Sequence, residues 1–316
     1  MSSYLRYALR AIPLLCLLST GSAMAYDLPS VNLGLTSFLD GVLPSGGGFY
    51  YQNYLQYYTT SRFEDSAGHR LPLPTENMNL WADINQFTYY FDATVGPGRF
   101  ALDVVIPTVM SARVNDSLDG RALNSQAGLG DVVFAPIYQI NPVTLGNDSS
   151  LHQSLEFNIL TPTGSYDRNI AINPGANVWA LDPYYSMTLF TSDKLSFSGR
   201  LHYLYNFTDN EPSLALGQGA HSLRPGQAFH FNFAAAYAAT PKLGLGLNGY
   251  FLKQLTETKI NGTGVPGRSE RVLGIGPGAI FTLDKNNFLF FNAYWETLVE
   301  NRAQGERFQA RFIHHF

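Results

Sequence analysis

The sequence has almost no cysteine, little charge and, beyond its first residues, no long apolar run. Its 316 residues include a single cysteine, Cys16, which excludes a disulfide framework and a cysteine-ligated metal site. Charged residues make up 14% of the chain, whereas a water-soluble domain has about 25%. No later apolar run approaches the roughly 18 residues of a membrane helix. The composition therefore fits neither an ordinary soluble domain nor a helical membrane protein, and the net charge of −4 gives no indication of nucleic acid binding.

The first 25 residues have the three parts of a secretory signal peptide. Arg6 and Arg10 form a basic start, an apolar run follows around Leu14 to Leu18, and Ala23-Met24-Ala25 supplies small residues for cleavage. The apolar run is too short for a membrane anchor. We expect cleavage after residue 25 and export. Because the removed part holds two of the 20 basic residues and none of the 24 acidic ones, the mature chain has a net charge of −6.

The rest of the chain alternates apolar and polar residues with a period of two, which predicts β-strands. We expect about twelve of them, at 48–63, 79–94, 99–112, 127–140, 151–162, 177–191, 194–208, 227–239, 243–256, 270–283, 288–299 and 307–316. The connections alternate in length. Tight turns such as 95–98 and 192–193 fall between longer polar loops near 64–78, 113–126, 163–176, 209–226, 257–269 and 300–306.

Short periplasmic turns and long extracellular loops are typical of an outer-membrane barrel. We therefore predict an all-β fold, a transmembrane antiparallel β-barrel of about 12 strands formed by residues 48–316, in the bacterial outer membrane. A soluble β-sandwich would also alternate, but its connections need not alternate in length. The last segment ends on an aromatic residue with aromatics on one face, which resembles the signal for barrel insertion: Phe308, Phe312 and Phe316.

Alternation also assigns the two faces of each strand, because successive side chains point to opposite sides of a sheet. In 194–208, Phe197 and Leu201 share the predicted lipid face, while Ser198 and His202 share the other. The same reasoning predicts a polar network in the lumen: Asp83, Asp103, Asp131, Glu156, Arg200, His202, His230, Glu296 and Arg311. These residues could line a substrate pathway or form ion pairs that hold a narrow barrel together, and the sequence leaves both interpretations open.

Residues 26–47 precede the first strand and carry several apolar side chains, including Leu33 and Phe38, before a glycine-rich stretch. Something must cover those apolar groups. The segment is therefore expected either to insert into the lumen, which we favour, or to rest on the periplasmic rim.

One pair of residues suggests enzyme chemistry, because His152 and Ser154 lie on the same face of a strand, where a base could meet a nucleophile. The H-x-S pattern resembles the core of outer-membrane phospholipase, but Leu155 stands where that family has asparagine. Asn115, Asp116 and Asp119 lack the spacing of a calcium loop. We predict no catalytic residue, no metal and no cofactor.

Four short motifs occur in order along the chain: Gly128-Leu-Gly-Asp131 with Pro136, Leu160 to Asp167, Asn173 to Trp179 with Pro183, and Val299-Glu-Asn-Arg302. Together they resemble the outer-membrane family of the MetA pathway of phenol degradation. The resemblance implies a barrel that carries hydrophobic compounds across the outer membrane. It implies no catalytic or binding residue.

We therefore expect a channel for passive uptake of small hydrophobic or aromatic compounds. The expected partners are outer-membrane lipid and lipopolysaccharide, the barrel assembly machinery and a small hydrophobic solute, with no nucleic acid. Two alternatives remain at this stage. One is a lipid-acting enzyme that uses His152 and Ser154, and the other is a structural or adhesive barrel whose loops bind a partner.

Overall fold

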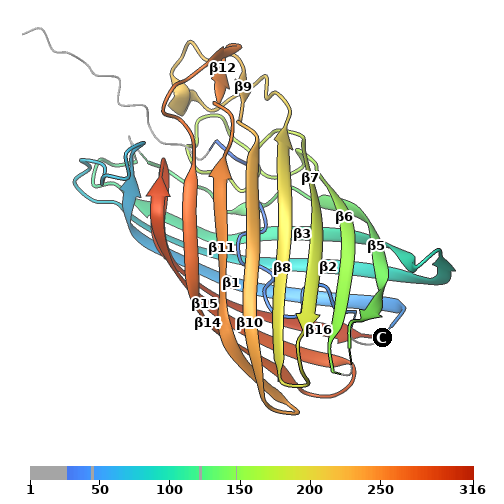
Figure 1. Cartoon of the computed structure of the whole chain (residues 1–316). Helices are drawn as coiled ribbons and strands as arrows, with labels where there is room; N and C mark the ends of the chain where they lie inside the picture. Colours follow the sequence, from blue (N-terminus) through green and yellow to red (C-terminus); the bar gives the residue numbers. More distant parts are fainter. Residues whose placement is uncertain (1–26, 44–45, 121–122, 147) are drawn as a thin grey trace, which may run out of the picture.

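The computed structural model describes residues 27–43, 46–120, 123–146 and 148–316 and shows a closed antiparallel β-barrel of twelve strands (Figure 1). The predicted signal peptide, residues 1–25, lies outside the described residues. The barrel strands are β1 (Gly48–Glu64), β2 (Asn77–Val95), β3 (Gly98–Asn115), β4 (Gly128–Leu129) with β5 (Val133–Thr144), β6 (Ser150–Leu160), β7 (Ala180–Phe190), β8 (Leu195–Asn206), β10 (Ala228–Thr240), β11 (Leu243–Gln254), β14 (Arg271–Thr282), β15 (Asn287–Glu300) and β16 (Arg302–His315).

Each strand pairs with its neighbour in sequence, and the first strand pairs with the last, so the predicted fold class is confirmed. β4 and β5 together act as one strand beside β3. The closing seam runs from the pair Tyr50 and His315 to the pair Glu64 and Arg302. Closure leaves the barrel without an exposed sheet edge. Among the described residues, no helix has the length and apolarity needed to cross a membrane.

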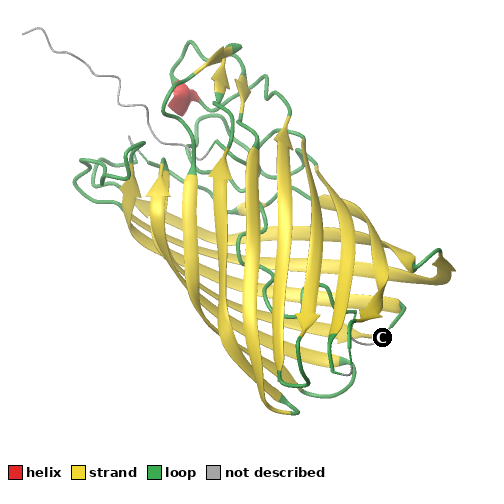
Figure 2. Cartoon of the chain, viewed as in Figure 1, coloured by secondary structure: helices red, strands yellow, loops and turns green. Residues whose placement is uncertain are grey.

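The connections differ at the two ends of the barrel, as Figure 2 shows. The short turns 96–97, 145–149, 191–194, 241–242 and 283–286 lie at one end. The long loops 65–76, 116–127, 161–179, 207–227 and 255–270 lie at the other. These loops hold a small sheet of β9 (Leu223–Arg224), β12 (Lys259–Ile260) and β13 (Thr263–Gly264), and the one-turn helix η1 (Leu214–Leu216).

One predicted loop is absent. Residues 300–306 were expected to form a long polar loop, but β15 and β16 are joined at Asn301 alone, which adopts a left-handed conformation with φ of 53°. β16 therefore begins five residues earlier than predicted, at Arg302, and pairs with β1 as far as Glu64. Asparagine tolerates this backbone conformation better than most residues do. The two strands pair with each other only as far as Trp295 and Glu306; beyond that pair β15 continues beside β14 and β16 beside β1.

The outer face of the barrel is apolar and aromatic. Phe197, Leu201 and Tyr203 on β8 are 42–45% exposed, while Ser198 and His202 between them are buried. Leu155 and Phe157 on β6 are exposed in the same way. A closed barrel that exposes such side chains around its wall has the surface of a membrane-spanning protein.

Residues 27–43 lie inside the barrel and run along its length. Near the long loops, Asp27 pairs with Arg268, with Nε–Oδ2 2.5 Å apart. Midway, Gly34 donates its N–H to Asn232 Oδ1 at 3.0 Å. Near the short turns, Gly41 donates its N–H to Thr188 Oγ1 at 3.0 Å. The segment therefore contacts the wall from one end of the lumen to the other.

Candidate functional site: the lumen and its cavity

Most of the predicted lumenal residues lie on the inner face of the wall. Their side chains are buried, or 12% exposed for Arg200, and they contact other side chains of the inner wall or the N-terminal segment: Asp103, Glu156, Arg200, His202, His230, Glu296 and Arg311. The inner wall is consequently a hydrogen-bonded polar surface, as a barrel lumen requires. Whether those residues form a solute pathway stays a prediction.

The prediction that Asp83 faces the lumen is wrong, because this residue lies on the outer face. The inner positions of β2 are Ala82, Ile84 and their even-numbered neighbours, which line the cavity described below. Asp83 instead accepts hydrogen bonds from Asn53 at 2.6 Å and Asn85 at 2.9 Å on the outer side. The prediction used alternation and took the side of the strand with Asp83 as the lumenal one, but here polar groups satisfy one another on the lipid side while apolar groups line the lumen.

Glu296 of β15 is the centre of one polar cluster. It accepts hydrogen bonds from the hydroxyls of Tyr58 at 2.7 Å and Tyr250 at 2.8 Å, and from the N–H of Gly305 at 2.8 Å. Arg307 lies 4.0 Å from the carboxylate. A buried carboxylate with this many donors is held in place, so the cluster joins four strands across the lumen.

A second cluster consists of Asp182, His202 and His230 on neighbouring strands. Asp182 Oδ2 lies 2.9 Å from His202 Nδ1, and Asp182 Oδ1 lies 3.1 Å from His230 Nε2. The two imidazole rings stack with centroids 4.1 Å apart. The three side chains are buried, and within the described residues they are the group that could hold a metal ion. The same contacts suit a hydrogen-bonded network that joins β7, β8 and β10. Asp182 was not among the predicted lumenal residues.

Arg200 links the wall to the N-terminal segment. Its guanidinium Nη2 lies 3.5 Å from Asp40 Oδ1, and the same group lies 4.3 Å from the ring centroid of Tyr184. The hydroxyl of Tyr184 in turn donates to the carboxylate of Glu156. These side chains extend across the lumen at about its middle.

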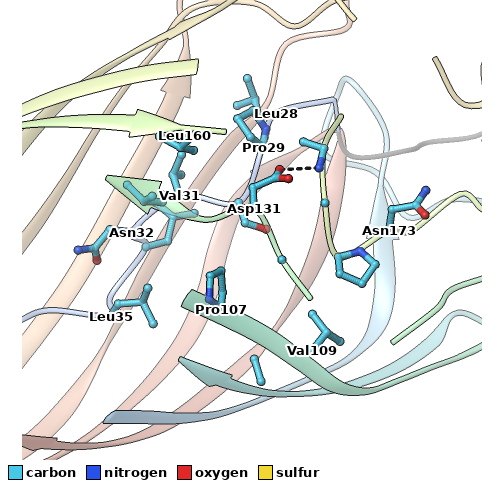
Figure 3. A pocket seen from close by; sticks show the side chains of 18 of the residues that line it. Leu28, Pro29, Val31, Asn32, Leu35, Pro107, Val109, Asp131, Leu160 and Asn173 are labelled. Atoms are coloured by element: carbon cyan, nitrogen blue, oxygen red, sulfur yellow. Dashed lines mark hydrogen bonds between the residues drawn. The ribbon is translucent and has the colours of Figure 1, made fainter. Parts of the chain in front are cut away.

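Between these side chains and the long loops, the lumen holds a cavity of about 360 Å³. Among the described residues, its lining runs from loop positions such as Asp209 and Leu216 to Glu156 and Arg200. Figure 3 shows Leu28, Val31 and Leu35 of the N-terminal segment along one side, with Leu160 beside Val31, while Pro107 and Val109 lie lower in the view. The cavity thus combines apolar side chains with polar groups, both near the long loops, as at Asp131 and Asp209, and at its base. Sites for small organic molecules combine apolar surface with placed polar groups in this way.

Asp131 holds the long loops over the cavity. Its carboxylate accepts hydrogen bonds from the N–H groups of Gly164 at 2.9 Å and Ala176 at 2.7 Å, and so ties both ends of one loop to the start of β5. Gly164 and Gly175 approach so closely that a Cβ on either would meet the other's backbone within 2.8 Å. Burial raises the pKa of the neighbouring loop carboxyl of Asp209, which also lines the cavity.

His152 and Ser154 do not pair with each other. The hydroxyl of Ser154 lies 2.6 Å from that of Ser186, and His152 Nε2 lies 3.3 Å from Ser150 Oγ. A base that activates a nucleophile has to be within hydrogen-bond reach of it.

Comparison with known proteins gives one family and several related folds. The model of the family described as "Putative MetA-pathway of phenol degradation" matches residues 60–312. A comparison with curated protein sequences gave no match. An outer membrane channel from Pseudomonas putida F1 has a similar crystal structure, with a TM-score of 0.76 at 16% identity over 91% of this chain and 100% of that one.

Two further solved barrels are more distant. The KdgM porin has a TM-score of 0.42 at 9% identity, over 84% of this chain and 99% of that one. The translocator domain of the autotransporter NalP from Neisseria meningitidis has a TM-score of 0.44 at 13% identity, over 87% of this chain and 91% of that one.

The closed wall, apolar outer belt and hydrogen-bonded inner wall define a bacterial outer-membrane β-barrel. Within that class, this chain belongs to the MetA-pathway phenol degradation family, and the resemblance seen in the sequence is confirmed.

Proposed function

We propose that this protein is an outer-membrane channel for the uptake of small hydrophobic or aromatic compounds. The observation that carries the proposal is the cavity of about 360 Å³ that begins under the long loops and ends at Glu156 and Arg200. Apolar side chains such as Val109 and Leu160 line it, and polar groups lie both under the loops and at its base. Such a lining favours a solute with a mostly apolar surface and one polar substituent, as phenol has.

Family membership supports the same solute class, because the family takes its description from phenol degradation. The outer membrane has a lipopolysaccharide surface that excludes apolar molecules, so a protein route serves a cell that grows on them. The channel in the related crystal structure supports the architecture of this proposal and leaves the solute to experiment.

Our proposal does not include catalysis. The hydroxyl of Ser154 bonds to Ser186 rather than to His152, and both side chains of that serine pair are buried on the inner face. A lipid-cleaving site would have to reach the lipid from the outer face.

The experiment that tests the proposal uses planar or vesicular bilayers with lipopolysaccharide in one leaflet. Entry of toluene and phenol would be measured with the wild-type barrel, with Ala82→Trp and with Ala235→Trp. Ala82 lines the cavity, so tryptophan there should fill it and lower uptake, whereas Ala235 lies in β10 on the outer face and serves as the matched control. Absence of uptake of any apolar solute by the wild-type protein would refute the proposal.

A further inference from the structure

Asn158 of β6 lines the lumenal cavity with an amide whose hydrogen bonding is incomplete. Its Oδ1 is buried, and none of the described residues donates a hydrogen bond to it. Asp182 faces it across the pairing with β7, but a carboxylate offers no donor, and this one is held by His202 and His230. On the β5 side the register skips Ala135, which has no polar side chain. The neighbouring wall therefore supplies no partner for this oxygen.

Other amides of the inner wall are used by the protein itself. Asn232 accepts a hydrogen bond from the N–H of Gly34 at 3.0 Å and so holds the N-terminal segment. Asn206 also has an oxygen without a partner, but its Nδ2 donates to the carbonyl of Gly226 at 2.8 Å. Neither of these two side chains lines the cavity. Of the three asparagines, Asn158 is the one that a solute in the cavity meets.

Apolar side chains next to Asn158 form a surface for a ring. Leu160 lies two residues further along the same face of β6, which is about 6.5 Å in a strand, and it also lines the cavity. Val31 of the N-terminal segment and Val133 of β5 pack against the cluster that contains Leu160. Figure 3 shows Leu160 beside Val31. An aromatic ring against these side chains directs a substituent toward the level of Asn158.

The charged groups at the base of the cavity have partners of their own. Arg200 lies 3.5 Å from Asp40, and the carboxylate of Glu156 accepts a hydrogen bond from the hydroxyl of Tyr184. Within this group the carboxyl groups of Asp40, Glu156 and Asp182 outnumber the single guanidinium. An anionic solute therefore meets like charge here, whereas an uncharged polar group does not.

An unpaired amide discriminates between solutes of the same shape. In a hydrated cavity, a solute has to replace the water bound to a polar group of the wall. A hydroxyl that does so restores the hydrogen bond, whereas a methyl group leaves the amide unpaired and loses affinity. A carboxamide has both an acceptor and donors, and a hydroxyl both donates and accepts, so the two match with the amide in either orientation.

We propose that Asn158 recognises the hydroxyl of uncharged hydroxylated aromatic compounds, and that the cavity thereby prefers them to aromatic hydrocarbons and aromatic carboxylates. The inference rests on the proposed channel function and specifies which members of the solute class the cavity selects. The ring lies against Leu160 and the N-terminal segment, and the hydroxyl bonds to the carboxamide.

The test compares equilibrium binding of 2-naphthol and 2-methylnaphthalene, which differ by a hydroxyl in place of a methyl group. Both are titrated against the purified full barrel in detergent, with naphthyl fluorescence as the readout and empty micelles as the correction for partition. We expect the wild-type protein to bind 2-naphthol about tenfold more tightly, which corresponds to about 1.4 kcal/mol. Asn158→Leu should abolish this preference by weakening 2-naphthol alone.

Two alanine variants provide the matched control. Asn158→Ala removes the same amide without adding an apolar side chain, so it remains the test if Asn158→Leu fails to fold, and it should also lose the preference. Asn206→Ala removes an amide with an unpaired oxygen outside the cavity and should keep it.

Three results would overturn the assignment of hydroxyl recognition to Asn158. They are equal binding of the two solutes by the wild-type protein, an undiminished preference in the Asn158 variants, and tighter binding of 2-naphthoate than of 2-naphthol, which would move recognition to Arg200. In each case uptake of apolar solutes by the wild-type protein would leave the channel intact. Absence of both binding and uptake would overturn both proposals.

Discussion

Removal of the Phe38 side chain should release the N-terminal segment from the lumen. Phe38 is 1% exposed, and its ring occupies space left by Gly246 and Gly278, at either of which a Cβ would lie within 2.8 Å of it. Phe38→Ala costs about 3–5 kcal/mol for a buried site. Phe38 belongs to the segment rather than to the wall, so the substitution lowers the free energy with which the segment docks in the lumen. The undocked fraction of the segment should therefore rise by roughly 150- to 5,000-fold.

The assay is conductance in planar bilayers. We expect Phe38→Ala to approach the conductance of a barrel that lacks residues 27–43, with long open periods that the wild-type protein rarely shows. Phe197→Ala removes the same ring from the outer face, where it is 43% exposed, and should conduct like the wild type. If the deletion opens the channel but Phe38→Ala does not, the docking energy of the segment lies elsewhere and our reasoning is wrong.

Three other variants have clear expected outcomes. Glu296→Leu leaves two tyrosine hydroxyls and Gly305 N–H without an acceptor and should destabilise the barrel by about 3–5 kcal/mol in urea unfolding. Ser154→Ala loses one hydrogen bond, about 1 kcal/mol, and should leave solute uptake unchanged; loss of a hydrolytic activity would instead revive the enzyme alternative. Arg268→Ala removes the partner of Asp27 and should speed hydrogen exchange at Leu28, whereas the exposed Lys242→Ala should not.

The barrel could be predicted from the sequence because its signal is repeated in every strand. Residues such as Phe197 and Leu201 alternate with Ser198 and His202, and the same alternation recurs between turns whose lengths alternate as well. Since a strand has one lipid face, this pattern survives errors of a residue or two in any single strand. The lengths of the long loops also follow from their polar composition, with the exception of 300–306, where the strands continue beside β14 and β1 and only Asn301 lies outside them.

The face of Asp83 could not be predicted because β2 carries both kinds of residue on both sides. Its inner positions include Leu80 and Ile84, which line an apolar cavity, and its outer positions include Asp83 and Asn85, which bond to each other. Alternation identifies a face only when one side is polar and the other is not. An apolar cavity in the lumen removes that contrast.

The clusters of the site depend on which strands are neighbours and how they are staggered. Asp182 and His202 are 20 residues apart, and His230 is 48 residues from Asp182; nothing in the sequence between them fixes their register.

The path of the N-terminal segment has a consequence for how the barrel assembles. The segment leads into β1, yet its carbonyls at Leu33 and Leu35 accept hydrogen bonds from Arg307 and Gln309 of β16, the last strand. These contacts join residues 274 positions apart, the kind of long-range contact that forms slowly. Docking of the segment is therefore complete only once β16 has joined β1, because part of the hydrogen bonding of the segment comes from that last strand.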